Sequence, residues 1–214
     1  ASDADAGTTI TFSLSGTDAG DFAINSETGA ITFASAPNFE SPTGGAGNNS
    51  NAYSLNVVAS DGTNTDTEAI VVNVTDANDN NPVLSVATPY SVVEGATTVA
   101  TVTASDADAG TTITFSLSGT DSGDFAIDSS SGAITFNSAP DFETPGSVAN
   151  SNAYSLNVVA SDGTNTDTEA IVVNVTDTND ESPVLSVATP YSVAENTTTV
   201  ATVTASDADA GTTI

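Results

Sequence analysis

The sequence predicts an all-β chain of tandem seven-stranded Greek-key β-sandwiches arranged end to end. One observation is internal repetition: the decapeptide Ala-Ser-Asp-Ala-Asp-Ala-Gly-Thr-Thr-Ile begins at Ala1, Ala104 and Ala205, and residues 52–76 recur letter for letter as residues 153–177. A second is that apolar and polar residues alternate in short segments separated by Gly, Asp, Asn and Ser. A third is that no segment shows helical periodicity. Seven such segments in a repeat of about one hundred residues are typical of a β-sandwich.

Each expected strand is an alternating segment bounded by turn residues. Inward-facing series are clearest in the third, sixth and seventh segments, which place Phe115, Leu156 and Val173 among the core residues. Both Tyr53 and Tyr154 are expected to be buried. The seven strands of the complete repeat are expected over residues 84–94, 97–105, 112–118, 125–128, 133–136, 154–161 and 169–176.

The domain boundaries are placed at the prolines that follow two acidic clusters, Pro82 and Pro183. Residues 82–182 then form a complete repeat. Residues 1–81 form a partial repeat that lacks its first two strands, and residues 183–214 supply only the first two strands of another. The chain also has no Met, so we expect it to be a window of a longer protein.

Charge excludes several classes of function. The chain has 28 Asp and Glu residues, no Lys, Arg or His, and a net charge of −28. Such a chain repels nucleic acid and anionic membrane surfaces. Without Cys, His or Lys it also lacks thiolate, imidazole and Schiff-base chemistry and the usual zinc ligands. No apolar run is long enough to insert directly into a membrane. The composition leaves only catalysis by a pair of carboxylates, as in glycoside hydrolysis. We expect that the chain is not an enzyme.

Strand direction sorts the carboxylates between the two ends of each sandwich. If successive strands alternate in direction, the first, third, fifth and seventh strands finish at one end, and the second, fourth and sixth at the other. One end then collects Glu94, Asp141, Glu143, Asp177 and Asp180, and the opposite end collects Asp106, Asp108 and Asp162.

Stacked repeats would bring opposite ends together, and this predicts a metal site. The first junction would gather six carboxylates, Glu40, Asp76, Asp79, Asp106, Asp108 and Asp162. Two carboxylates about 5 Å apart repel by about 3 kcal/mol at an effective dielectric constant near 20, so several pairs could cancel most of the stability of a domain. Calcium suits an irregular cage of oxygen ligands better than magnesium, and three calcium ions would balance six charges.

Five spaced motifs resemble those of cadherin repeats, in particular the repeats of very large bacterial surface adhesins. Residues 76–80 before Pro82 and residues 177–181 before Pro183 resemble the cadherin linker. Residues 106–108 resemble the family's Asp-x-Asp motif, residues 160–162 its late single Asp, and residues 141–143 its Asp-x-Glu motif. Its early Glu corresponds to Glu94 or Glu195. The likeness spans the whole chain.

The resemblance implies an immunoglobulin-like sandwich with about three calcium ions at each inter-repeat junction. Two departures are visible, because Asn38 stands where the next copy has Asp141, and Glu181 stands where the previous linker has Asn80. Absence of Trp excludes adhesion by Trp-docking strand exchange. The residues that it assigns to calcium are Asp3, Asp5, Asn38, Glu40, Asp61, Asp76, Asn78, Asp79, Asn80, Glu94, Asp106, Asp108, Asp141, Glu143, Asp162, Asp177, Asn179, Asp180, Glu181, Asp207 and Asp209.

The function expected from these observations is mechanical. Calcium at each junction would stiffen the array into an extender or stalk of a secreted or surface-anchored adhesin, projecting a distant binding module outside the cell. The partners would be neighbouring repeats of the same or an identical chain, with head-to-tail or lateral self-association. Near-identical copies suit a spacer, which needs length rather than individuality.

Two other functions stay open at the level of sequence. Residues 183–214 supply the strands that residues 1–81 lack, so identical chains could assemble head to tail into a filament by strand complementation. A sugar-binding or carboxylate-pair hydrolase module is the third reading, weakened by the absence of Trp and the presence of only four Tyr. The dipeptide Asp162-Gly163 taken alone would also fit an ordinary turn.

Overall fold

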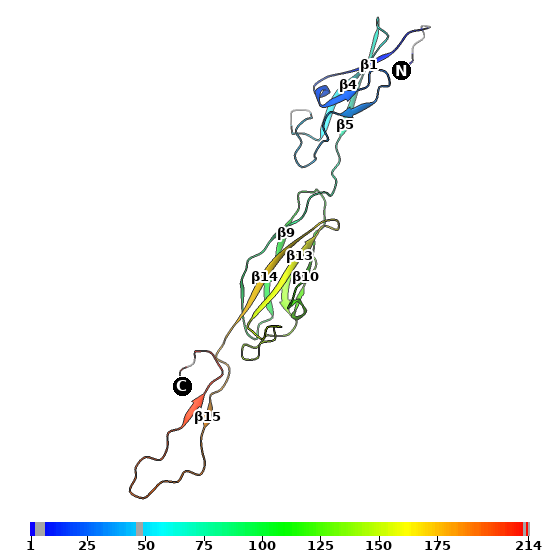
Figure 1. Ribbon diagram of the computed structural model, residues 1–214. Helices are drawn as coiled ribbons and strands as arrows, with labels where there is room; N and C mark the ends of the chain where they lie inside the picture. Colours follow the sequence, from blue (N-terminus) through cyan, green and yellow to red (C-terminus); the bar gives the residue numbers. More distant parts are fainter. Residues whose placement is uncertain (3–6, 46–48, 212, 214) are drawn as a thin grey trace. The chain divides into compact units, whose positions relative to one another are not determined.

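A computed structural model describes residues 1–2, 7–45, 49–211 and 213 of the chain (Figure 1). The chain divides into two compact units. The first unit comprises Ala1–Asp79 with Ala107–Gly110, and the second comprises Asn80–Asp106 with Thr111–Ile214. The division into three repeats stays a prediction. In the described part of the chain, no helix has the length and apolar character needed to cross a membrane.

The second unit contains a β-sandwich. One sheet has four strands in the order β10 (Thr114–Ser118), β13 (Ala153–Ser161), β14 (Thr166–Thr176) and β7 (Tyr90–Val93), and Figure 1 shows β13 and β14 in yellow and orange across this unit. The other strands form a sheet in the order β11 (Phe125–Ile127), β12 (Ala133–Phe136) and β8 (Thr98–Thr101), and the pair β6 (Val83–Ser85) and β9 (Thr103–Ser105). The predicted all-β sandwich is therefore confirmed.

The core of this sandwich follows the predicted alternation. On β13, every second residue from Tyr154 to Ala160 is at most 3% exposed, and on β14 the same holds for Ile171 and Val173. An aromatic group packs beside them, with Phe125, Phe136 and Tyr154 ring centroids 4.2 to 5.6 Å apart. Burial of these faces drives the pairing of the two sheets, because apolar area is removed from water.

The first unit repeats part of this arrangement. A three-stranded sheet has the order β1 (Thr11–Ser15), β4 (Ala52–Ser60) and β5 (Thr65–Asn73), and β2 (Phe22–Ile24) pairs with β3 (Ile31–Phe33). Its buried apolar residues include Phe22, Tyr53 and Leu55. Both predicted buried tyrosines are confirmed, since Tyr53 and Tyr154 are each 3% exposed.

Two predicted strands were wrong as single elements. The strand expected over 84–94 is two strands, because β6 pairs with β9 whereas β7 pairs in parallel with β14. Pro89 lies between them and has no N–H to donate to a ladder. The strand expected over 97–105 is likewise divided at Val102, whose N–H donates to Gly132 instead. Gly132 has φ +72°, and a Cβ there would lie 2.3 Å from the carbonyl oxygen of Val102.

Other boundaries shift for local reasons. The third predicted strand starts at Thr114, because its partner strand β13 ends opposite it at Ser161. The seventh starts earlier than predicted, at Thr166, because Thr166 also pairs with Ser161. The strand expected to include Asp128 stops at Ile127, where the Asp128 carboxylate accepts N–H bonds of a turn.

The remaining elements are short. Two single 3-10 turns, η1 (Ala19–Asp21) and η2 (Ser122–Asp124), are the only helical elements in the described residues, where the sequence predicted none. Near the carboxyl end of the second unit, β15 (Val184–Ser186) pairs with β16 (Thr204–Ser206).

Candidate metal centre

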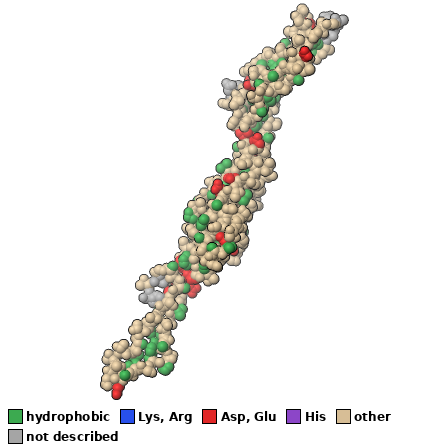
Figure 2. Space-filling model, in the orientation of Figure 1, with side chains coloured by type: hydrophobic (Ala, Val, Ile, Leu, Met, Phe, Trp, Pro, Cys, Tyr) green, Lys and Arg blue, Asp and Glu red, His purple; other side chains and the backbone are tan. Residues whose placement is uncertain are grey.

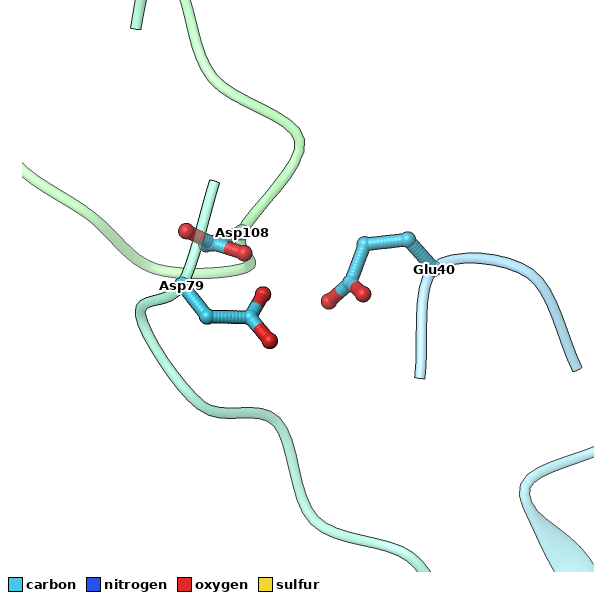
Figure 3. Close-up of side chains that lie close together, drawn as sticks. All are labelled: Glu40, Asp79 and Asp108. Atoms are coloured by element: carbon cyan, nitrogen blue, oxygen red, sulfur yellow. The ribbon is translucent and has the colours of Figure 1, made fainter. Parts of the chain in front are cut away.

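Three carboxylates converge in the first unit. Glu40 lies in the loop between β3 and β4, Asp79 follows β5, and Asp108 follows β9; one carboxylate oxygen of each lies within 4.8 Å of the others. Figure 3 shows Glu40 and Asp79 extending toward one another, with Asp108 beside Asp79. Asp108 is only 5% exposed. Strand ends therefore bring together acids that are far apart in sequence, as the sequence predicted.

Asp76 extends this group. One of its carboxylate oxygens accepts a hydrogen bond from the backbone N–H of Ala109. The other, Oδ1, and Oε1 of Glu40 are buried and have no hydrogen-bond partner among the described residues. The backbone N–H of Glu40 lowers its carboxyl pKa, but burial and the nearby Asp76 and Asp79 together raise that pKa above its ordinary value. Two buried oxygens are thus left without a donor in a strongly negative setting.

The second unit holds a larger group centred on Glu143. One oxygen of Glu143 lies within 4.8 Å of oxygens of Asp177 and Asp209, and Glu143 also groups in this way with Glu94 and Asp141. These residues follow β7, β12, β14 and β16. Asp209 is 5% exposed. Oε1 of Glu143 and Oδ1 of Asp177 are buried and lack a hydrogen-bond partner in the part of the chain that the structure describes.

Backbone N–H groups hold this second group in place. The Glu94 carboxylate accepts from the N–H of Thr178 at 2.6 Å and from the N–H of Phe142 at 2.8 Å. Its own N–H donates to the carbonyl of Thr176 at 3.1 Å, because β7 and β14 run in parallel and end side by side. Asp177 accepts from the N–H of Ala210. Glu94 therefore connects two acidic segments without a basic side chain.

Burial and, to a smaller extent, neighbouring negative charges raise the pKa values of two acids in this group. Burial raises the pKa of Glu143 to about 7; its own backbone N–H opposes that rise, and the charges of Glu94, Asp177 and Asp209 add to it. Burial also raises the pKa of Asp209, against the N–H of Glu181 and with the help of Asp207. Since the chain has no Lys, Arg or His, no side-chain cation balances these acids, and Figure 2 shows red patches without blue or purple.

In metal-free solution these shifts predict a thermal stability that falls as pH rises. A carboxyl whose folded pKa is raised keeps its stability contribution below the unfolded value, 4.5 for Glu143, and loses it as pH rises toward about 7. We expect the melting temperature in chelator to fall by several degrees between these values, measured by circular dichroism. Glu143→Gln should flatten the slope. A melting temperature that rises with pH in this window would contradict the prediction. Hydrogen bonds from backbone N–H groups lower the pKa values of Asp61 and Asp128, so the contribution of these two residues to stability changes only in more acidic solution.

The acids after the second and sixth strands also meet. Carboxylate oxygens of Asp106 and Asp162, both in the second unit, lie within 4.8 Å of one another. Asp162 also closes a turn, because its Oδ1 accepts from the N–H of Thr164 and of Asn165 at 2.6 Å each. The side-chain amide of Asn165 donates to the carbonyl of Asn80 at 2.8 Å. The turn interpretation and the clustering of Asp162 with Asp106 are therefore both correct.

Other residues predicted to bind metal make the following contacts, and their role at a metal stays a prediction. The side chain of Asn38 accepts from the N–H of Ser41 at 2.7 Å, and Asp61 closes the same kind of turn as Asp162. The Glu181 N–H donates to Asp209, and the Asp207 carboxylate accepts from the Asp209 N–H. The linker residues Asn78, Asn179, Asp180 and Glu181 are exposed. Asp3 and Asp5 lie outside the described residues.

Sequence reasoning missed two kinds of polar residue. Asp18 and Asp121 are each 4% exposed, and their carboxylates accept from the N–H groups of Ser54 and Ser155 at 2.6 Å. These acids hold the 3-10 turns against the neighbouring strand, and their identical position in both copies was the available signal. Asn51 and Asn152, whose side-chain amides donate to the carbonyls of Phe39 and Phe142, are the second kind.

The donor set of both groups fits a hard divalent cation. All the converging atoms are carboxylate oxygens, and several are buried without a hydrogen-bond donor. Calcium accepts six to eight oxygen ligands in irregular geometry, whereas zinc and copper favour nitrogen and sulfur ligands that this chain lacks. The residues that could hold calcium are Glu40, Asp76, Asp79 and Asp108 in the first unit, and Glu94, Asp141, Glu143, Asp177 and Asp209 in the second.

Comparison with known proteins agrees with this architecture. The sequence model of the Cadherin domain family matches residues 88–176. The chain contains a cadherin domain. This confirms the resemblance that the acidic motifs predicted, and because cadherin domains are adhesion modules, it also agrees with the expectation of no enzyme.

Relatives and solved structures support the same assignment. Human Protocadherin Fat 4 is 35% identical over 193 residues, which are 86% of this chain and 4% of that protein. Mouse Cadherin EGF LAG seven-pass G-type receptor 2 is 37% identical over 204 residues, 89% of this chain and 6% of that protein. The cadherin chain therefore spans only a small part of either relative.

Two crystal structures resemble the chain over nearly its whole length. Mouse Cadherin-23 EC22-24 has a TM-score of 0.73 and 28% identity, covering 98% of this chain and 69% of that chain. The Protocadherin GammaB4 extracellular domain has a TM-score of 0.73 and 31% identity, covering 98% of this chain and 34% of that chain.

Proposed function

We propose that this cadherin chain is a calcium-stiffened extender of a secreted or surface-anchored adhesin, which projects a more distant binding module outside the cell. The observation that carries the proposal is the pair of carboxylate groups around Glu40 and Glu143, each with buried oxygens that no described residue satisfies. Cadherin domains generally bind calcium. Their repeats are found in extracellular adhesion proteins.

The electrostatics of these groups give calcium its mechanical role. Without metal, acids such as Glu143 and Asp177 repel one another and favour separation of the segments that carry them. A calcium ion bound between the same acids would attract each of them and so hold their segments together. We propose about three ions at each junction, bound in the sub-millimolar to millimolar range of extracellular modules.

Two features of the sequence suit an extender. Residues 52–76 and 153–177 are identical, as expected of a spacer whose repeats need no individual specificity. The chain has no Lys or Arg, so proteases that cleave after basic residues find no site in it. A surface adhesin of the bacterial kind that the sequence resembles would gain from both.

Small-angle X-ray scattering tests the stiffening directly. We expect the scattering of the chain to report a stiffer, less variable particle in excess calcium than in chelator. A third sample in chelator with high sodium chloride is the control, because salt screens repulsion between exposed charges without supplying a shared ligand. Equal flexibility in calcium and in chelator, or equal stiffening by sodium chloride, would refute the mechanism.

A further inference from the structure

Two loops of different length end on the same contact. The loop over residues 41–51 is longer than its counterpart over residues 144–152, and their sequences differ except near their ends. The side-chain amide of Asn51 donates to the carbonyl of Phe39 at 2.8 Å, and that of Asn152 donates to the carbonyl of Phe142 at 2.8 Å. The contact therefore recurs although the loops that precede it have diverged.

The contact fixes the peptide at the middle of an acidic segment. Phe142 lies between Asp141 and Glu143, and its N–H donates to Glu94 while its carbonyl accepts from Asn152. Both the N–H and the carbonyl of Phe142 are therefore hydrogen-bonded. Because Glu143 is the next residue, its direction depends on how Phe142 is held, and in the first unit Phe39 precedes Glu40 in the same way.

The backbone of the same asparagine holds the other acidic segment. The carbonyl of Asn152 accepts from the N–H of Val175 at 2.8 Å, two residues before Asp177. In the first unit the carbonyl of Asn51 accepts from the N–H of Val74 at 2.8 Å, two residues before Asp76. One residue therefore connects the two segments whose carboxylates face one another.

The oxygen atom of the same side-chain amide is in an unfavourable position. Oδ1 of Asn51 and of Asn152 is buried and has no hydrogen-bond partner among the residues described. A buried acceptor without a donor is unfavourable. An apolar side chain would remove that unsatisfied oxygen, so stability of the loop alone does not explain the asparagine. The hydrogen bond that the amide donates to the acidic segment explains why asparagine is present.

We propose that Asn51 and Asn152 are positioning residues for calcium, which orient Glu40 and Glu143 without binding the ion themselves. The inference rests on the proposed calcium function. It assigns to the amide the role that outer-shell hydrogen bonds have at other metal sites, where their loss weakens binding by about 10- to 100-fold.

The test combines calcium titration by calorimetry with melting in chelator. In the double variant Asn51→Leu with Asn152→Leu, we expect calcium affinity to fall about tenfold, while the melting temperature in chelator stays equal or rises. The matched control is Asn137→Leu, which removes a side-chain amide bond to the carbonyl of Gly123 outside the acidic segments. It should leave calcium affinity unchanged.

The outcomes separate this inference from the function on which it rests. Unchanged calcium affinity in the double variant would overturn the positioning role while the calcium function stands. Failure of the unsubstituted chain to bind calcium would overturn both. If the leucine variant does not fold, the smaller pair Asn51→Ser with Asn152→Ser is measured against the same criteria.

Discussion

Removal of calcium is expected to lower the melting temperature of the chain by roughly 10 to 20 °C. A ligand that binds only the folded state at one hundred times its dissociation constant stabilises that state by about 2.7 kcal/mol. In a domain of this size, each kcal/mol corresponds to about 4 to 8 °C. One bound ion therefore suffices for the expected shift, and the groups around Glu40 and Glu143 offer places for more.

The measurement is a thermal melt followed by circular dichroism near neutral pH, with excess calcium and with chelator. Magnesium at the same concentration is the control for ionic strength and for divalent charge. Magnesium requires near-octahedral geometry and gives up its water reluctantly, so we expect it to restore only a small part of the stability. A shift below about 2 °C on calcium removal would show that these carboxylates do not form a stabilising calcium site.

The substitution Asp177→Asn should have opposite effects in the two conditions. In chelator, loss of one negative charge beside Glu143 and Asp209 relieves repulsion, so the variant should melt at a higher temperature than the unsubstituted chain. In calcium, the buried Oδ1 of Asp177 is no longer part of a carboxylate, and we expect affinity to fall by about 100-fold. The two melting curves should therefore change order when calcium is added.

Glu169→Gln provides the matched control. It also removes one negative charge, but Glu169 lies on β14 itself rather than just after it, is exposed, and lies outside the acidic groups. We expect the order of its melting temperature relative to the unsubstituted chain to be the same in calcium and in chelator. If Asp177→Asn behaved like Glu169→Gln, Asp177 would have no direct part in calcium binding.

Periodicity predicted those parts of the fold that local alternation decides. The inward series on β13 and β14 needed only the rule that successive side chains face opposite sides of a sheet, and burial of Leu156 and Val173 confirms it. The same rule could not predict that residues 84–94 divide between two sheets. That outcome depends on the partners β9 and β14, which lie far along the chain.

The sequence predicted those parts of the candidate site in which the ends of strands determine which acids lie together. Strand direction placed Glu94 beside the end of β14 and grouped Asp106 with Asp162, and both arrangements are present. The contacts of Asn51 and Asn152 were not predictable, because a side-chain amide bonded to a carbonyl ten or more residues away leaves no periodic pattern. Buried Asp121 was hidden for the same reason, since its partners are backbone N–H groups of a distant strand and loop.

The parallel pairing of β7 with β14 determines how the sandwich of the second unit responds to tension. A pull on the chain ahead of β7 and behind β14 drives these neighbouring strands in opposite directions along their length. The four residue pairs from Tyr90 with Val173 to Val93 with Thr176 are then loaded together in shear, rather than opened one after another. A sandwich held in this way resists stretching through the combined strength of these hydrogen bonds.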